Sequence, residues 1–148
     1  MNKVKVGMVG VGAISGIYLE NITKTFHELY DTMEELFADP EIDIVLNLTR
    51  PYEHFDVSMG AIQAGKHVYS EKPLGATLEE GKLLVKAAEE KGVLLGGAPD
   101  TFLGAGIQTC RKLIDDGFIG DVVGAAAFMI CRGHESWHPD PEFYYKHG

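Results

Sequence analysis

The most reactive combination of residues in the chain lies in the segment 64–74, which reads AGKHVYSEKPL. A short apolar strand is predicted over residues 67–70, and it ends on Glu71, Lys72 and Pro73. The carboxyl ends of parallel strands are where α/β sheets bind ligands. A lysine ammonium there offers a compact positive charge with three N–H donors, so Lys72 can orient a substrate hydroxyl or share a proton with it. The alternative is that Lys72 is a solvated loop lysine and that Pro73 only stops the strand.

A second candidate site follows the first predicted strand, residues 3–9 (KVKVGMV), whose valines are typical of a buried parallel strand. Gly10, Gly12 and Ser15 come next, and residues 17–22 have the apolar spacing of a helix. In a dinucleotide site the first glycine makes the tight turn and the second lets the backbone approach a pyrophosphate at the helix N-terminus. Ser15 stands where Gly or Ala is usual and is small enough for close packing. A glycine turn without a ligand is the alternative.

Other polar residues follow predicted strand ends and have two interpretations each. His54 lies in the first turn of a helix and either contacts a cofactor or is an ordinary polar residue of a helix start. Arg50 is expected to face the cofactor cleft. Asp100 and Thr101 either bind substrate hydroxyls or form a turn with the preceding proline. The Lys72–Pro73 bond is a candidate for the cis form, which X-Pro bonds adopt at about 5–6% in folded proteins.

Together these segments resemble the Gfo/Idh/MocA family of NAD(P)-dependent oxidoreductases. The matching stretches are GVGAIS at residues 10–15, the strand at 42–49 with Pro51 and His54 after it, AGKHVYSEKPLG at 64–75, and LIDDGFIGDV at 113–122. The resemblance covers almost the whole chain and depends mainly on the glycine turn and the Glu-Lys-Pro segment.

The resemblance implies an α/β fold with a doubly wound (Rossmann-like) parallel sheet, followed by the start of a truncated α+β second domain. It implies hydride transfer between NAD or NADP and a sugar or polyol, with Lys72 as the catalytic residue. The residues expected to bind the cofactor are Gly10, Gly12, Ala13, Ile14, Ser15, Thr49, Arg50, His54, Glu71 and Lys72. The residues expected to contact the substrate are Asp100, Thr101 and His138. The intact protein is expected to be a homo-oligomer.

Two departures from the family pattern stand beside this match. A strand and a helix are missing near the Phe26–His27 junction, and with them the acidic or basic residue that distinguishes NAD from NADP. Glu28 and Asp31 lie at about the right distance from the glycines, but no strand precedes them. Either the protein has lost these elements or the sequence joins pieces of a longer chain. The family's second catalytic motif, an Asp and a His on a helix, also has no counterpart before Gly148.

The order of elements predicts a parallel sheet with alternating helices. Residues 1–121 are expected to form the dinucleotide-binding domain and residues 122–148 the first strand and loop of the substrate domain. The expected strands are 3–9, 42–48, 67–70, 93–95 and 122–131, and the last is expected to be poorly covered. The expected helices are 14–25, 33–38, 51–63, 77–90 and 103–116.

Composition restricts the partners. The chain has 148 residues and a net charge of −9, without a basic stripe, so nucleic acid and anionic membrane are poor partners. No signal peptide or membrane span is evident. Cys110 and Cys131 have no metal or disulfide spacing and are expected to be buried thiols of a cytoplasmic protein.

Residues 134–138 read HESWH and match the H-E-x-x-H pattern of zinc proteases. A glycine precedes the pattern and a proline follows it, which disfavours the helix that the two histidines require. We therefore predict no metal site and place His138 in a loop or in the lining of a substrate cleft.

Three functions are compatible with these residues. The first is an oxidoreductase in which Lys72 assists hydride transfer. The second is a nucleotide-binding module without catalysis. The third is an interaction protein that keeps only the fold. Cofactor titration separates the third function from the others, and turnover with polyols separates the first from the second.

Overall fold

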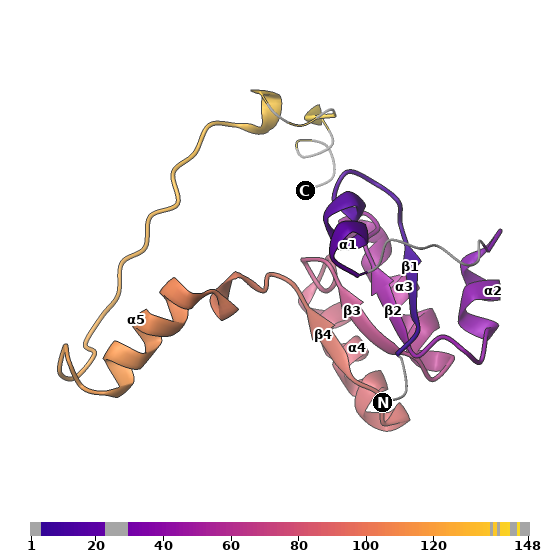
Figure 1. The fold of residues 1–148 in the computed structure, drawn as a ribbon, viewed down its shortest axis with the longest axis horizontal. Coiled ribbons are helices and arrows are strands. Elements are labelled where there is room, and N and C mark those ends of the chain that lie inside the picture. The colour runs from indigo at the N-terminus through magenta and orange to yellow at the C-terminus, as the bar shows by residue number, and fades with distance from the viewer. Residues whose placement is uncertain (1–3, 23–29, 137, 139, 143–144, 146–148) are drawn as a thin grey trace. The chain divides into compact units, whose positions relative to one another are not determined.

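The computed structural model describes residues 4–22, 30–136, 138, 140–142 and 145, and the chain divides into two compact units, Met1–Pro99 and Asp100–Gly148 (Figure 1). The first unit contains β1 (Val6–Val9), α1 (Ser15–Ile22), α2 (Met33–Ala38), β2 (Ile44–Asn47), α3 (His54–Gln63), β3 (His67–Ser70), α4 (Leu78–Lys91) and β4 (Leu95–Gly97), with a 3-10 turn at Pro51–Glu53. The second contains α5 (Ala105–Asp115) and 3-10 turns at Thr101–Leu103 and His134–Ser136. The predicted domain boundary at residue 121 stays a prediction.

The four strands form one parallel sheet in the order β1-β2-β3-β4. This confirms the predicted Rossmann-like α/β class. In the usual doubly wound order, strands lie on both sides of the first strand, whereas β1 is at an edge of the sheet among the described residues. The predicted loss of a strand and a helix falls at Phe26–His27, which lies outside the described residues.

Helix α3 is the centre of the packing, because it contacts β2 and β3 as well as α2 and α4 (Figure 1). Strand β2 is apolar and buried over most of its length, as a central parallel strand should be. Apolar side chains from these elements form the core, and those at most 3% exposed are Val45, Ala61, Ile62, Val68 and Leu84. Burial of a side chain the size of Leu84 contributes about 1.5–3 kcal/mol.

Local signals fix the ends of several helices as predicted. Thr77 and Glu80 form a capping box at the start of α4, in which each side chain accepts a hydrogen bond from the other's backbone N–H. Gly92 ends the same helix in the left-handed conformation, with φ of 70°. Thr32 caps α2 by accepting from the Glu35 N–H at 3.2 Å. These contacts explain why the predicted bounds of α2 and α4 agree closely with the observed ones.

Several predicted elements differ from the structure. Strand β4 begins two residues later than predicted, at Leu95, and the Leu94 N–H donates to the His67 side chain, at Nδ1, over 2.9 Å. The predicted helix at 103–116 is a 3-10 turn followed by α5. Residues 122–131 form no strand, because a strand needs a partner to complete its hydrogen bonds and the described part of the second unit contains no other strand.

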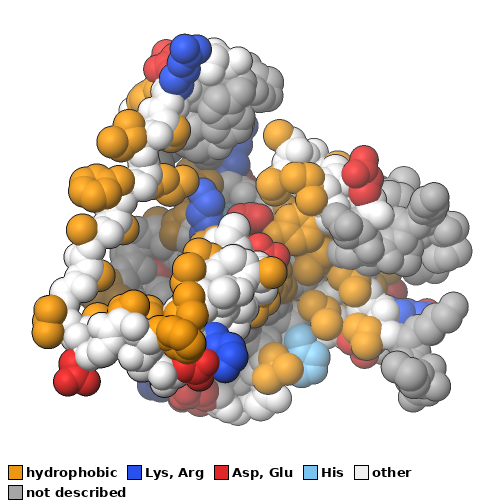
Figure 2. Space-filling view, turned by 60° about the vertical axis from the view of Figure 1, so that its left-hand side comes forward, with side chains coloured by type: hydrophobic (Ala, Val, Ile, Leu, Met, Phe, Trp, Pro, Cys, Tyr) orange, Lys and Arg blue, Asp and Glu red, His pale blue; other side chains and the backbone are white. Residues whose placement is uncertain are grey.

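The apolar side chains of this last segment are exposed, as the sequence predicts. Val123 is 100% exposed and Met129 96%, and Figure 2 shows hydrophobic side chains spaced along the extended stretch. Cys110 and Cys131 lie in the same unit and are also exposed. The prediction that both thiols are buried is therefore wrong, because neither α5 nor the extended segment is covered within its unit.

Gly10 is required by the backbone at the end of β1. Its φ is +92°, and a Cβ atom there would lie 2.7 Å from the Leu48 carbonyl carbon and oxygen and from the Thr49 nitrogen. We expect Gly10→Ala to lower the free energy of unfolding by at least ~1–3 kcal/mol, since it adds backbone strain to a clash with backbone atoms. Urea denaturation measures the change. Gly16→Ala is the control, because a Cβ at position 16 would meet nothing within 4 Å. Equal stability of the two variants would contradict the requirement for glycine at position 10.

Asp39 makes the stability of the first unit dependent on acid. The Tyr30 hydroxyl donates to its carboxylate, the Glu41 N–H donates to it at 2.7 Å, and Lys5 and Lys66 add favourable charge, so the pKa of Asp39 is lowered from 3.8. A lowered carboxyl pKa contributes stability that is present above the ordinary value and is lost as pH falls through the folded value. We expect Tyr30→Phe to raise the pKa of Asp39 and to shift the acid-induced loss of stability to higher pH. An NMR titration of the carboxyl carbon detects the shift, and an unchanged titration curve would rule out the role of Tyr30.

Candidate functional site

Three of the predicted site segments lie together at the carboxyl ends of the parallel strands. Val9, Asn47 and Ser70 are aligned in the strand register, so the residues that follow each strand begin at the same level. These residues are the glycine turn after β1, the loop around Thr49 after β2 and the Glu-Lys-Pro loop after β3. The predicted convergence at the carboxyl ends of parallel strands is therefore present in the structure.

The glycine turn leads directly into α1. The Ser15 side chain donates to the Gly12 carbonyl oxygen at 2.7 Å and is 3% exposed, which fits the small residue expected at this position. Ala13 and Ile14 are exposed. A Cβ atom on Gly12 would meet nothing within 4 Å. The turn therefore needs glycine at position 10, where a side chain would clash with the backbone, and has open space beside the Cα of Gly12.

A buried polar network organises the loop after β2. Asn47 is fully buried, and its amide nitrogen donates to the His54 carbonyl oxygen at 3.0 Å and to Ser58 Oγ at 2.9 Å. Its side-chain oxygen, Oδ1, accepts from the Thr49 hydroxyl at 2.6 Å. Sequence analysis did not single out Asn47 or Ser58. The available signal was a polar residue at the end of an apolar strand, seven residues before His54.

His54 joins two loops. Its ring is 1% exposed, with Nδ1 against the Pro73 carbonyl oxygen and Nε2 3.0 Å from the Thr49 carbonyl oxygen. Both partners are backbone carbonyl oxygens, which accept hydrogen bonds. The structure gives His54 a role in holding the Thr49 loop to the Glu-Lys-Pro loop, and its predicted contact with a cofactor stays a prediction.

The Glu-Lys-Pro loop is held at its backbone and at its acidic side chain. The Glu71 N–H donates to the Asn47 carbonyl oxygen at 2.8 Å, and Glu71 Oε1 accepts from the Tyr18 hydroxyl at 2.8 Å. The Lys72–Pro73 bond is cis, as the sequence suggests. Lys72 is exposed, and its ammonium makes no hydrogen bond or ion pair with another described residue.

Arg50 is tied to its own loop. The Arg50 guanidinium donates to the Tyr52 hydroxyl at 3.0 Å, and the Arg50 backbone N–H donates to Glu53 Oε2 at 3.2 Å. The side chain is exposed, so Arg50 stays at the surface of the loop that follows β2.

The predicted substrate residues lie in the second unit, which is described by itself. Asp100 and Thr101 are exposed and take part in a 3-10 turn, in which the Leu103 N–H donates to the Asp100 carbonyl oxygen at 2.9 Å. His138 Nδ1 accepts from the Asp140 N–H at 3.0 Å. The observed turn begins at Asp100 and does not include Pro99, and substrate contact by the three residues stays a prediction.

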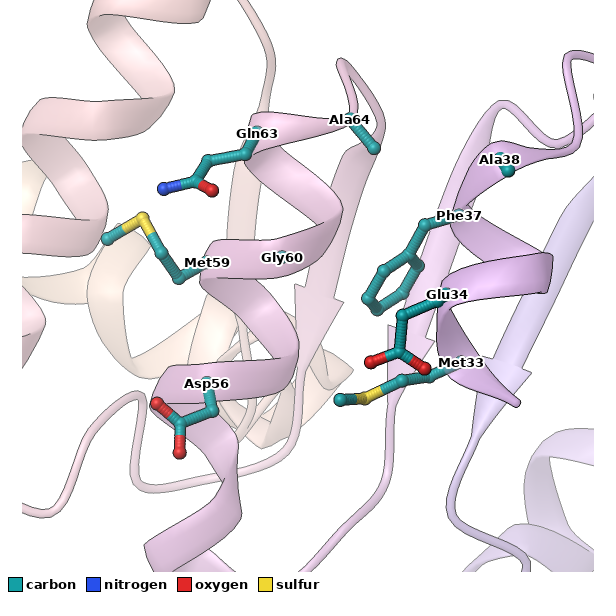
Figure 3. Close-up of a pocket in the computed structure, with 9 residues that line it drawn as sticks. All are labelled: Met33, Glu34, Phe37, Ala38, Asp56, Met59, Gly60, Gln63 and Ala64. Atoms are coloured by element: carbon teal, nitrogen blue, oxygen red, sulfur yellow. The ribbon is translucent and has the colours of Figure 1, made fainter.

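Two further observations concern alternative sites. Over the described residues, no group of three His, Cys, Asp or Glu side chains comes together, and residues 134–136 form a 3-10 turn, not the α-helix of a zinc protease. A groove of about 510 Å³ lies between α2 and α3, with Met33, Phe37 and Met59 among its lining residues (Figure 3). None of the predicted site residues lines this groove.

The family model for the oxidoreductase family with an NAD-binding Rossmann fold, GFO_IDH_MocA, matches residues 23–97. The chain belongs to the Gfo/Idh/MocA family. The match covers the Asn47 network and the Glu-Lys-Pro loop but begins after the glycine turn. The assignment of the turn in this Gfo/Idh/MocA chain therefore depends on the strand–turn–helix geometry described above.

Several Gfo/Idh/MocA-type proteins are similar to this chain. The scyllo-inositol 2-dehydrogenase (NADP(+)) IolW of Bacillus subtilis is 42% identical over 95 residues, which are 64% of this chain and 26% of the relative. The 1,5-anhydro-D-fructose reductase of Ensifer adhaerens is 40% identical over 97 residues, which are 66% of this chain and 29% of the relative. A crystal structure of Synechocystis biliverdin reductase with biliverdin and NADP+ matches with a TM-score of 0.53 and 39% identity, over 60% of this chain and 28% of that one.

The matched part of the Gfo/Idh/MocA chain thus spans about a quarter to a third of the length of these two curated relatives. Among the described residues, none of the helices has the length and apolar character needed to cross a bilayer. The expected cytoplasmic location stays a prediction.

Proposed function

We propose that this chain is the dinucleotide-binding part of an NAD(P)-dependent dehydrogenase that interconverts a hydroxyl and a carbonyl group of a sugar or polyol. The observation that supports this most is the convergence of the glycine turn, the Thr49 loop and the Glu-Lys-Pro loop at one edge of a parallel sheet. Ligands of open α/β sheets bind at this edge.

The glycine turn fits the cofactor's pyrophosphate. The space beside the Gly12 Cα is open, as a close approach of phosphate to the backbone requires. Ala13 and Ile14 are exposed just before α1, where backbone N–H groups at a helix start bind anions. Thr49, Arg50 and Glu71 at the neighbouring strand ends complete the proposed cofactor-binding set, and His54 contributes by holding their loops together.

Lys72 supplies the proposed acid–base chemistry. Its ammonium is exposed and has no partner among the described residues, so it is available to a substrate hydroxyl. The bound nicotinamide would accept or deliver the hydride. When the carbonyl is reduced, Lys72 Nζ would donate a hydrogen bond to its oxygen and pass a proton to it as the hydride reaches the carbon. In the oxidation direction, the hydroxyl proton would return to Lys72 Nζ as the hydride leaves.

The relatives support the substrate class. Their names specify scyllo-inositol and 1,5-anhydro-D-fructose, both small polyhydroxylated rings. Asp100, Thr101 and His138 are the proposed substrate contacts, and residues 122–148 the proposed start of a substrate domain. A homo-oligomer is the proposed state of the intact protein, which light scattering would measure.

The first test is to titrate the purified chain with NADH and with NADPH and to monitor binding by the fluorescence of the nicotinamide. Saturable binding of either is expected, and the preferred one decides between NAD and NADP. Absence of binding to both would overturn the proposal and favour an interaction protein that keeps only the fold. Binding without turnover on any polyol or sugar, in a polypeptide that includes a substrate domain, would instead favour a nucleotide-binding module.

A further inference from the structure

A side-chain hydrogen bond connects the helix after the glycine turn to the loop that carries Lys72. The Tyr18 hydroxyl donates to Glu71 Oε1 at 2.8 Å, in a partly buried position, across 53 residues of sequence. Tyr18 lies in the first turn of α1, three residues after Ser15. Neither the glycine-turn pattern nor the Glu-Lys-Pro pattern includes Tyr18.

The Glu71 carboxylate stands between Tyr18 and the backbone of the catalytic lysine. Its second oxygen, Oε2, accepts from the Lys72 N–H at 3.1 Å. The backbone on either side of Lys72 is held to the β2 side of the site, by the Asn47 carbonyl oxygen before it and by the His54 ring after it. The Glu71 side chain is instead held by α1.

The position of Tyr18 depends on the conformation of the glycine turn. Ser15 begins α1 and is bound to the Gly12 carbonyl oxygen through both its backbone N–H, at 3.2 Å, and its hydroxyl, at 2.7 Å. A phosphate that orders residues 12–15 therefore orders the first turn of α1, which contains Tyr18.

We propose that the Tyr18–Glu71 hydrogen bond couples occupation of the glycine turn to the position of Lys72, which makes Tyr18 a positioning residue. The proposal rests on the proposed cofactor-binding function. Coupling between sites is reciprocal, so the conformation of the Glu-Lys-Pro loop also affects the affinity for the cofactor. Coupling of this kind typically changes an equilibrium ~5- to 150-fold.

The test is amide hydrogen exchange of the full 148-residue chain, with and without saturating NADPH. In the wild type, NADPH is expected to slow exchange both at residues 12–15 and at residues 71–74. In Tyr18→Phe, which removes only the hydroxyl, the slowing at 12–15 is expected to persist and the slowing at 71–74 to fall at least ~5-fold. Tyr30→Phe is the matched control, because the Tyr30 hydroxyl bonds to Asp39, which precedes β2 at the opposite end of the strands.

Glu71→Ala tests the same bond from its other partner and keeps the proposal falsifiable if Tyr18→Phe does not fold. It is expected to lose the slowing at Lys72 and Leu74, and Tyr18→Phe should have no additional effect in its presence, since two residues that act through one bond are not additive. Equal slowing at 71–74 in the wild type and in Tyr18→Phe would overturn the coupling while the cofactor site stands. Absence of slowing at 12–15 in the wild type would overturn the cofactor site itself, and the coupling with it.

Discussion

Lys72→Ala is expected to lower kcat for the best polyol substrate by ~100- to 10,000-fold, the usual contribution of general acid–base assistance. The substitution removes the ammonium that has no partner among the described residues and faces solvent at the end of β3. Cofactor affinity should change much less. Steady-state kinetics with saturating cofactor measures the effect, in a polypeptide that includes a substrate domain.

Lys82→Ala is the control for this substitution, because Lys82 is an exposed lysine on α4 and its loss should leave kcat unchanged. A Lys72→Ala enzyme with the wild-type kcat would show that the lysine is only a loop residue. A large rise in KM for the cofactor at constant kcat would assign Lys72 to binding instead of chemistry.

Gly12→Val is expected to weaken NADH and NADPH binding more than tenfold, about 1.4 kcal/mol, without loss of the fold. The branched side chain would occupy the space that the pyrophosphate needs, while its Cβ would contact no atom of the protein within 4 Å. Calorimetry gives the affinity and circular dichroism the thermal midpoint.

Gly81→Val on α4 is the matched control, because the space around its Cβ is also open and it lies outside the glycine turn. It should bind cofactor with the wild-type affinity. Unchanged affinity in Gly12→Val would remove the dinucleotide interpretation of the turn, whatever the stability of the variant.

Sequence predicted the fold best where the signal is local. The cap at Thr77, the glycine at Gly92 and the apolar run of β2 each act within a few residues, so α4 and the sheet were predictable. Residues 122–131 have the composition of a strand but form none. A strand depends on a partner strand that can come from any part of a structure, and composition does not report whether that partner is present.

The part of the site that follows from the parallel arrangement of the strands was predictable from the sequence. The glycine turn and the Glu-Lys-Pro loop converge because parallel strands end at one edge. The Tyr18–Glu71 hydrogen bond, which connects α1 to the Glu-Lys-Pro loop, was not predictable. Its partners are 53 residues apart in the sequence, and no periodic pattern relates them. His54 was expected to contact the cofactor, and its burial between two carbonyl oxygens follows from the path of the backbone.

The strand order has a consequence for synthesis of the chain. Among the described residues, each strand pairs with the described strand that precedes it in the sequence, from β1 through β4. In a sheet whose first strand lies between later strands, one edge of the first strand stays unpaired until a strand far along the chain has been synthesised. Pairing these two strands closes a long loop, which has a higher entropic cost than closing a short one. The four described strands leave the ribosome in the order in which they pair, so each of them presents a hydrogen-bonding edge to the described strand that follows it.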